Sequence, residues 1–470
     1  MGGGPTQALA EFAAAFPGAG IPATARDAAA RSLLDTLACV VAGLAEESTR
    51  ILLDTVASEA PAGPCTAVGL DRPIAARQAA LINGCAAHAL DYDDTHDLAV
   101  LHPGVAVIPA ALATAESLGA SGRALLDAIV VGYDVQVRVA LAATRAPGRT
   151  GWHYTSACGI FGAAAAAGRL MGLDPGALAS VLGLACAQAC GTLQSEHDGT
   201  WAKRLQPGLA AAGGILAARL AARGFRGPPE ALEGTFGFFR VYLREFDPAP
   251  VLESLGQRFE VERTSLKPFP TCRFTHAPAG ALRELMRAHR LHADALESIE
   301  ARVTSAAFAE VCEPLVDKVR PKSRVHAQFS LPYALACVAD HGTVTLADLT
   351  EEAIRREDLL ALAGRVRCVR DQELEARWGE KIGEAEVRIR TREGLAVGAR
   401  ALPPGGPGSP MDESARKAKI GECLAWGGSD LQPSLLTETV NAMRHTGDVT
   451  VVGRTLWAHI RSSSRQPRGS

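Results

Sequence analysis

The sequence predicts a mainly helical protein in which a large all-helical domain is interrupted by a smaller α+β lid domain. From about residue 7 to residue 224, apolar residues recur at helical spacing. Alternating patterns typical of strands occur only between about residues 259 and 402, and helical periodicity returns after residue 411. A chain of 470 residues is also too long for one ordinary core, so we expect two domains.

The domain boundaries are placed where the pattern changes. Residues 1–266 are predicted to form the first part of the helical domain, and residues 267–402 the lid domain. The Pro- and Gly-rich stretch 403–410 has the composition of a connecting loop. Residues 411–460 are predicted to return to the helical domain, and residues 461–470 to form a flexible tail.

Several predicted helices of the first domain have recognisable starts. Ser121 and Asp174 are predicted N-caps, and Pro175 then occupies a favourable first-turn position. Thr155 or Ser156 is the predicted cap of the helix that follows them. The predicted helices are 27–44, 74–90, 105–118, 123–141, 159–171, 176–190 and 209–223.

Short strands distinguish the predicted lid. Residues 298–304 and 364–369 alternate between apolar and polar types, and segments 386–390 and 395–399 flank a turn that predicts a hairpin. We also expect a strand at 259–264, just ahead of the lid. The predicted helices of this half are 277–289, 326–339, 415–425 and 435–443.

Composition excludes several classes of protein. A net charge of −3 and a pI near 6.5 do not indicate the basic surface that binds nucleic acid. Eleven cysteines without a C-x-x-C pair indicate a reducing compartment, so we expect a cytoplasmic protein. The N-terminus lacks the pattern of a signal peptide. The longest uncharged run, 175–195, suits a buried helix better than a membrane span, so we expect no membrane association.

An acidic cluster between two predicted helices is the most informative stretch. Residues 91–102 hold four carboxylates and two imidazoles, in a chain that is 21% charged overall. Such a turn between apolar helices can line a cavity with polar groups. The structural alternative is a solvated turn whose aspartates cap the helices.

Further polar groups occur in similarly apolar surroundings. His153 precedes a predicted helix N-terminus, which disfavours a protonated imidazole and leaves a neutral ring able to exchange a proton; the alternative is a simple cap. Lys203 and Arg204 can hold a carboxylate, although adjacent side chains should diverge and only one is expected to face a site. Lys267 and Arg273 lie near the predicted domain junction.

Together these groups favour proton abstraction next to a carboxylate, with cations stabilising the enolate-like charge. Neither a phosphate-binding Gly-rich loop nor a metal-ligand motif of clustered Cys and His occurs, so we expect no metal and no cofactor. A rival interpretation is that Asp93, Asp94 and Asp97 fit the Asp-Asp-x-x-Asp magnesium motif of helical terpene cyclases. Aromatic residues make up only 5% of the chain, and no second acidic motif occurs.

Six short segments occur in a characteristic order. They are His88-Ala89-Leu90-Asp91-Tyr92-Asp93-Asp94-Thr95-His96, His102-Pro103-Gly104, Gly151-Trp152-His153-x-Thr155, Asp198-Gly199-x-x-x-Lys203, Lys267-Pro268-Phe269-Pro270-x-Cys272-Arg273 and Phe329-Ser330-Leu331-Pro332-Tyr333. Over roughly residues 30–340 this order resembles the MmgE/PrpD family, which includes 2-methylcitrate dehydratase, cis-aconitate decarboxylase and an iminodisuccinate epimerase. The resemblance implies a helical domain with an α+β lid, a homodimer, no cofactor and a small di- or tricarboxylate substrate.

The chain departs from the family pattern in three places. Tyr154 stands where many members have proline, and Gly104-Val105-Ala106 stands where the dehydratases have Ser-Asp-Asn after His-Pro. The decarboxylases' tyrosine has no clear counterpart near residues 319–322. Because of these departures, an epimerase-like or unassigned branch is an alternative to dehydration and decarboxylation, and a non-catalytic family member is a further alternative.

Carried over position by position, the resemblance implies active-site roles for Asp93, His102, His153, Lys203 and Lys267. We expect His153 and Lys267 to transfer protons, because closure of the lid would desolvate Lys267. Tyr154 is expected to act as an acid on the opposite face. The residues expected to orient or bind the substrate are Lys203, Arg273, His102, Asp93, Asp94, His96 and Arg204.

Overall fold

The computed structural model describes residues 4–15, 20–143, 151–243 and 245–450. The chain divides into two compact units. The helical unit comprises residues 1–194, 201–264 and 413–470, and the α+β unit comprises residues 195–200 and 265–412. Residues 195–200 were predicted to belong to the helical domain, but they belong to the α+β unit. The predicted tail, 461–470, lies outside the described residues.

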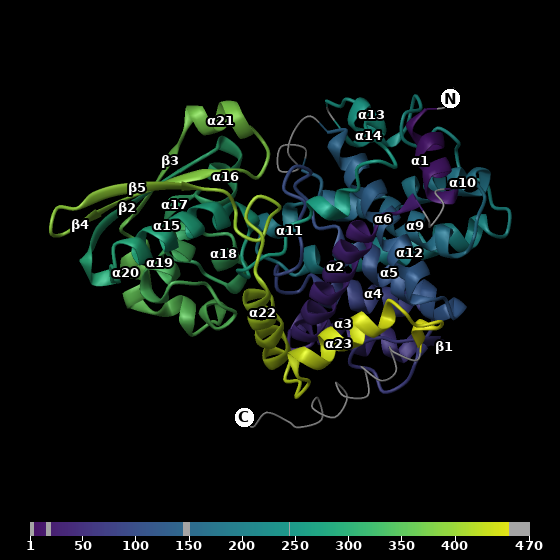
Figure 1. Ribbon diagram of the computed structural model, residues 1–470, viewed down its shortest axis with the longest axis horizontal. Helices are drawn as coiled ribbons and strands as arrows, with labels where there is room; N and C mark the ends of the chain where they lie inside the picture. The colour runs from purple at the N-terminus through teal and green to yellow at the C-terminus, as the bar shows by residue number, and fades with distance from the viewer. Residues whose placement is uncertain (1–3, 16–19, 144–150, 244, 451–470) are drawn as a thin grey trace. The chain divides into compact units, whose positions relative to one another are not determined.

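The helical unit is built almost entirely of helices (Figure 1). None of the described helices is by itself long and apolar enough to cross a membrane. Helices 23–43 and 47–59 reach the required length and apolar composition only when they are taken together, and a 90° bend separates them. The elements are α1 (Pro5–Ala15), α2 (Ala23–Gly43), α3 (Glu47–Glu59), β1 (Ala62–Cys65), α4 (Ala76–Ala87), α5 (Gly104–Leu118), α6 (Gly122–Leu141), α8 (Tyr154–Ala157), α9 (Gly159–Leu170), α10 (Pro175–Cys186), α12 (Ala202–Ala221), α13 (Phe238–Tyr242), α14 (Ala249–Leu252), η2 (Glu260–Arg263), α22 (Glu413–Trp426) and α23 (Pro433–Met443).

Helices α4 and α12 cross at two glycines, and this crossing positions the polar groups described below. A Cβ atom on Gly208 would lie 2.4 Å from the Leu81 carbonyl oxygen, and one on Gly84 would lie 2.8 Å from the Gly208 Cα. Only glycine permits the two backbones to approach so closely. The first turn of α12, which carries Lys203 and Arg204, is thereby brought to the C-terminal end of α4.

The C-terminal helices α22 and α23 pack on α2. Lys419 of α22 is buried, and its Nζ lies 2.6 Å from Asp35 Oδ1 of α2. The same ammonium donates to the Tyr92 carbonyl oxygen at 2.8 Å, and the Tyr92 hydroxyl donates to Glu422 at 2.9 Å. The returning helix thus anchors the segment between Asp91 and Asp93.

The α+β unit has one four-stranded sheet, in the order β3-β2-β4-β5. Strand β2 is parallel to β3 and antiparallel to β4, which forms the predicted hairpin with β5. Its elements are η3 (Arg273–Thr275), α15 (His276–Ala288), η4 (Ala293–Ala295), β2 (Leu296–Val303), α16 (Ser305–Val311), α17 (Leu315–Val319), α18 (Arg324–Gln328), α19 (Leu331–His341), η5 (Ala347–Leu349), η6 (Ala353–Arg355), α20 (Glu357–Ala363), β3 (Val366–Arg370), α21 (Gln372–Trp378), β4 (Ala385–Thr391) and β5 (Ala396–Ala401); α11 (Gln194–His197) begins at the unit boundary.

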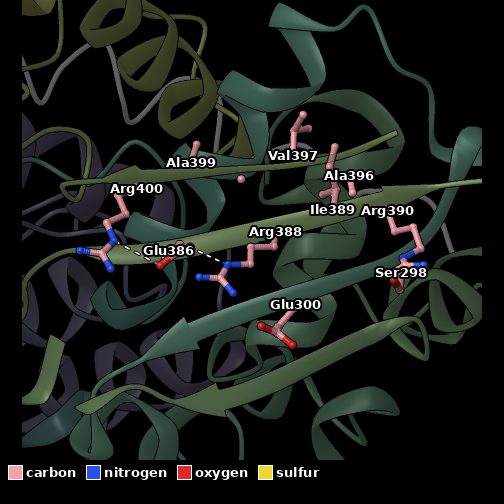
Figure 2. Close-up of a pocket in the computed structure, with 11 residues that line it drawn as sticks. Ser298, Glu300, Glu386, Arg388, Ile389, Arg390, Ala396, Val397, Ala399 and Arg400 are labelled. Carbon is pink, nitrogen blue, oxygen red and sulfur yellow. Dashed lines mark hydrogen bonds and ion pairs between the residues drawn. The ribbon is translucent and has the colours of Figure 1, made fainter. Parts of the chain in front are cut away.

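The two faces of this sheet differ in chemistry. Val387 and Ile389 of β4 belong to the buried core that includes α15 and α19. The alternate residues line an open hollow on the other face, where Glu386 lies 2.6 Å from Arg388 and 3.1 Å from Arg400 (Figure 2). The two arginines are 53% and 35% exposed at their side chains although Glu386 is buried, and ion pairs at a protein surface contribute about 0–1 kcal/mol each.

Four local predictions were wrong. Within the predicted strand 259–264, residues Glu260–Arg263 form the 3₁₀ turn η2, in which Glu260 makes ion pairs with Arg258 and Arg263, and none of the described strands pairs with this segment. The predicted helix 326–339 is two helices, since Ser330 caps the second of them. Helix α12 starts at residue 202, not at residue 209 as predicted. Neither Thr155 nor Ser156 caps α9.

Candidate active site

A fully buried carboxylate lies between two imidazoles in the helical unit. Asp93 Oδ2 is 3.0 Å from His88 Nδ1 and 2.8 Å from His102 Nδ1. The contact with His88 is an aligned hydrogen bond, whereas the contact with His102 has the distance of an ion pair without hydrogen-bond alignment. His88 follows α4 and His102 precedes α5, so the turn between these helices supplies the whole group.

Burial and charge act in opposite directions within this group. Burial lowers the pKa of His88 to about 4, and the neighbouring Asp93 only partly offsets this effect. Burial alone would raise the pKa of Asp93, but the adjacent His102 and His88 bring it well below its ordinary value. Near neutral pH the pair is therefore a carboxylate that accepts a hydrogen bond from a neutral His88 ring.

A second buried carboxylate, Asp91, is held by two cations from the first turn of α12. Its Oδ1 lies 2.9 Å from Lys203 Nζ and 3.3 Å from Arg204 Nη1. Arg204 Nη1 also donates to the His88 carbonyl oxygen at 3.2 Å. Asp91 has φ = 55°, a left-handed conformation that aspartate tolerates better than most residues. The expectation that Lys203 and Arg204 diverge was wrong, because both converge on Asp91.

His153 lies directly before the single turn α8, as predicted, and its side chain contacts α12. Its Nδ1 is 2.7 Å from Gln206 Oε1, and its backbone N–H donates to the Gly191 carbonyl oxygen at 3.0 Å. Gln206 Nε2 in turn donates to the Thr192 carbonyl oxygen at 3.0 Å. The imidazole is therefore oriented by a side-chain amide rather than by a carboxylate.

Ring contacts join these groups into one cluster. The His88 and His102 rings meet edge to face at 4.8 Å between centroids, and the His88 and His153 rings stack at 5.7 Å. The structure thus brings together Asp93, His102 and His153, and contacts through His88 connect them with the cations. Such a site offers proton-transferring imidazoles beside fixed charges, which is the requirement for acid–base chemistry at a carboxylate substrate.

Asp94 and His96 were predicted to bind the substrate, but each side chain is paired with another residue of the protein. Asp94 accepts hydrogen bonds from the Gly104 N–H at 2.9 Å and from the Tyr133 hydroxyl at 2.7 Å, and burial raises its pKa to about 7. His96 Nε2 lies 3.2 Å from Glu260 Oε2. Both side chains are buried in these pairs, which fix the turn around the cluster. The predicted acid Tyr154 is also buried, with 2% of its surface exposed.

We predict that Gly104→Ala lowers the free energy of unfolding by about 1–3 kcal/mol, the usual range for overpacking. A Cβ atom there would lie 2.7 Å from Asp94 Oδ1 and 2.8 Å from the Tyr133 hydroxyl oxygen. Urea denaturation would measure the change. Gly176→Ala is the matched control, because its Cβ would meet only Asp174 Oδ1 at 3.4 Å. Equal destabilisation by both variants would contradict this account of Gly104.

Lys267 and Arg273, two further predicted site residues, belong to the α+β unit. Lys267 is fully buried in the segment leading to η3. The Arg273 guanidinium donates to the carbonyl oxygens of Pro404 at 2.6 Å and Pro403 at 3.3 Å. Arg273 thus holds the predicted connecting loop, and its expected contact with substrate stays a prediction, as does the role of Lys267.

Comparison with known proteins gives the family. A model of the MmgE/PrpD N-terminal domain matches residues 7–251, which is more than half of the chain. The chain belongs to the MmgE/PrpD family. A model of the C-terminal domain matches residues 269–435, so this family member contains both domains in the expected order.

Relatives of this MmgE/PrpD protein include named decarboxylases. A cis-aconitate decarboxylase of Aspergillus terreus is 27% identical over 411 residues, covering 83% of each chain. A cis-aconitate decarboxylase-like protein of Aspergillus oryzae is 29% identical, covering 76% of this chain and 77% of the relative. The human cis-aconitate decarboxylase is 32% identical over 61% of this chain and 60% of its own. The chain is therefore an enzyme of this family.

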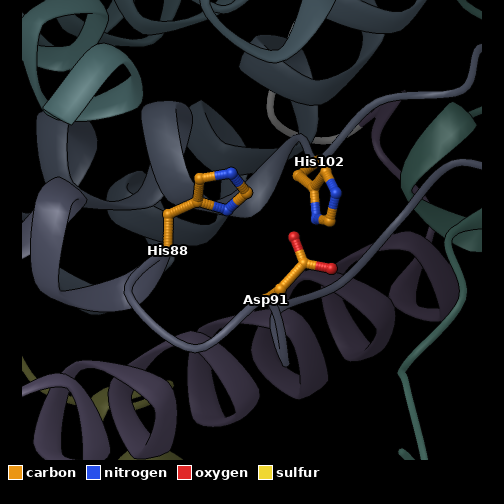
Figure 3. A group of neighbouring side chains, drawn as sticks. All are labelled: His88, Asp91 and His102. Atoms are coloured by element: carbon orange, nitrogen blue, oxygen red, sulfur yellow. The ribbon is translucent and has the colours of Figure 1, made fainter. Parts of the chain in front are cut away.

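One group in this MmgE/PrpD protein has the spacing of metal ligands. His88, Asp91 and His102 each offer an atom, and these atoms lie within 4.8 Å of one another (Figure 3). Asp91 already contacts Lys203 and Arg204, whose charges oppose a divalent cation in a buried site. Asp93, Asp94 and Asp97, the residues of the rival magnesium motif, are not members of this group.

Sequence reasoning missed three residues of the cluster. His88 and Asp91 stood within the quoted family motif but received no role. No sequence pattern indicated a role for Gln206, because it lies directly before Pro207 and outside the predicted helix 209–223. Its position in α12 becomes apparent only when the helix is extended back to residue 202.

Proposed function

We propose that this chain is a cofactor-independent lyase that decarboxylates a small unsaturated tricarboxylate of the cis-aconitate class. The observation that carries the proposal is the cluster of Asp93, His102 and His153 beside the Asp91–Lys203 pair. The decarboxylase relatives favour loss of carbon dioxide over the other family reactions. The epimerase-like branch favoured by the sequence departures is the second candidate.

The cluster suits the charge changes of such a reaction. Loss of carbon dioxide from the CH2 arm breaks a carbon–carbon bond and leaves its electron pair on an allylic carbon. The adjacent double bond delocalises that pair to the carbon that bears a remaining carboxylate, and this carbon is the one that takes the proton. A cation beside that carboxylate stabilises the developing enolate-like charge, and an imidazole delivers the proton that completes the product. Lys203 is suited to the first role, and His153 and His102 to the second.

The fixed charges of the cluster balance one another. The carboxylates of Asp91 and Asp93 formally cancel the charges of Lys203 and Arg204. A tricarboxylate therefore needs further positive charge. Lys267 enters the proposal through the family resemblance alone, which implies an active-site role for it.

Incubation with di- and tricarboxylates in deuterated water, followed by NMR, tests the proposal. We expect cis-aconitate to lose one carboxyl group and gain one solvent deuterium at the carbon that is protonated. Deuterium exchange without loss of a carboxyl group would favour epimerisation instead. Turnover should survive exhaustive chelation. Inactivity towards the whole panel, or activity restored by one divalent ion after chelation, would overturn the proposal.

We further propose a cytoplasmic homodimer. All eleven cysteines are free, in keeping with a reducing compartment. The homodimer follows from the family resemblance. Light scattering of the purified protein would give its mass in solution, to be compared with 49.0 kDa for one chain.

A further inference from the structure

We propose that Gln206 is a positioning residue that fixes the tautomer of His153, so that Nε2 is the atom that exchanges a proton with the substrate. The inference rests on the proposed function insofar as it concerns turnover. It goes beyond that function by naming the reacting atom and the residue that selects it. Neither the motifs nor the predicted site residues included Gln206.

The argument begins with the orientation of the Gln206 amide. Its NH₂ group lies 3.0 Å from the Thr192 carbonyl oxygen, which can only accept a hydrogen bond. The amide oxygen must therefore be the atom 2.7 Å from His153 Nδ1. Because an amide oxygen can only accept, Nδ1 must carry the hydrogen in this pair. In a neutral ring the basic lone pair is then on Nε2.

Neighbouring contacts hold both partners in place. The His153 backbone N–H donates to Gly191, and Trp152 forms a β-bridge with Thr192, so the segment around the imidazole is paired with residues 191–192. The Ser156 hydroxyl donates to the Gln206 carbonyl oxygen at 3.1 Å and connects α8 with α12. The imidazole and its amide partner are thus positioned by the same short segments.

The chemical identity of the partner matters as much as its position. The two imidazoles have different neighbours at Nδ1, a carboxylate for His102 and a neutral amide for His153. A carboxylate favours the protonated form of an adjacent ring, whereas an amide oxygen orients the ring without adding a charge. We infer that this difference keeps the two histidines in distinct roles.

Gln206→Glu tests this inference, because it keeps an acceptor at Nδ1 and adds a negative charge. The limb of the kcat/KM pH profile that depends on His153 should move to higher pH by about one unit or more. Gln206→Leu, which removes the acceptor, should lower kcat by about 10-fold or more with little change in KM. The control is Gln188→Leu, since Gln188 donates to the Leu184 carbonyl oxygen at 2.9 Å, and its profile should match the wild type.

Nitrogen-15 NMR of the histidine rings gives a readout that does not need turnover. The His153 signals, assigned by their loss in His153→Ala, should show the Nδ1–H tautomer in the wild type and a mixture in Gln206→Leu. An Nε2–H tautomer in the wild type would overturn the inference, as would an unchanged pH profile in Gln206→Glu. Inactivity of the wild type towards every polycarboxylate would instead count against the proposed function while leaving the tautomer result valid.

Discussion

Replacing His153 with alanine should lower kcat by at least about 10²-fold, the usual effect of losing an acid–base group. The residue is 4% exposed and hydrogen-bonds through Nδ1 to Gln206, so Nε2 is the nitrogen proposed to transfer the proton. Truncation leaves a space beside the His88 ring that is the size of an imidazole. Added imidazole should therefore restore part of the lost rate, and steady-state kinetics with and without it would measure this.

His341→Ala is a suitable control, because His341 is another histidine held by a side chain, with Nε2 3.1 Å from Asp348 Oδ2, and it is not one of the predicted site residues. Its kcat should stay within about twofold of the wild type, since this substitution removes no group of the cluster. An effect of His153→Ala confined to KM would assign His153 to binding alone. A normal kcat would remove it from the mechanism.

Much of the helical architecture could be predicted because its signals are local. Asp174 caps α10 as expected, with Oδ1 accepting from the Ala177 N–H at 2.8 Å, and Ser121 caps α6 in the same way. The hairpin also formed where alternation and a turn coincided. Such features depend on residues a few positions apart, which a single sequence displays directly.

The site was harder to predict because its contacts span the chain. Asp91 pairs with Lys203, 112 positions away, and His153 with Gln206, 53 positions away. The pairing of Asp91 with both cations depends on the close crossing of α4 and α12 at Gly84 and Gly208. A pattern of polar residues can indicate that a site exists, but it cannot say which carboxylate meets which cation.

Asp93→Asn should lower kcat by about 10³-fold, because it removes the charge between His88 and His102 while keeping the shape of the side chain. The loss of a carboxylate that orients a catalytic histidine has effects of this order. The variant amide can accept from His88 Nδ1, but its NH₂ group would face His102 Nδ1, which lies 2.8 Å from the native carboxylate. Kinetics on the substrate identified by NMR would measure the change.

The same variant should lose stability in a way that depends on pH. In the folded protein the pKa of Asp93 lies well below its ordinary value because of His102 and His88, against the opposing effect of burial. The carboxylate therefore contributes stability that is complete above its unfolded pKa, about 3.9, and is lost as pH falls towards the lower folded value. Wild type and Asp93→Asn should differ by about 2–3 kcal/mol at pH 7, and the difference should shrink below about pH 4.

Denaturant unfolding at a series of pH values would measure this difference. Asp127→Asn is the control, because Asp127 is a buried carboxylate paired with Arg26 at 2.6 Å but lies outside the cluster. This control can lose stability, yet its kcat should match the wild type. If Asp93→Asn instead kept a normal kcat while losing stability, Asp93 would hold the turn together without orienting His102 for catalysis.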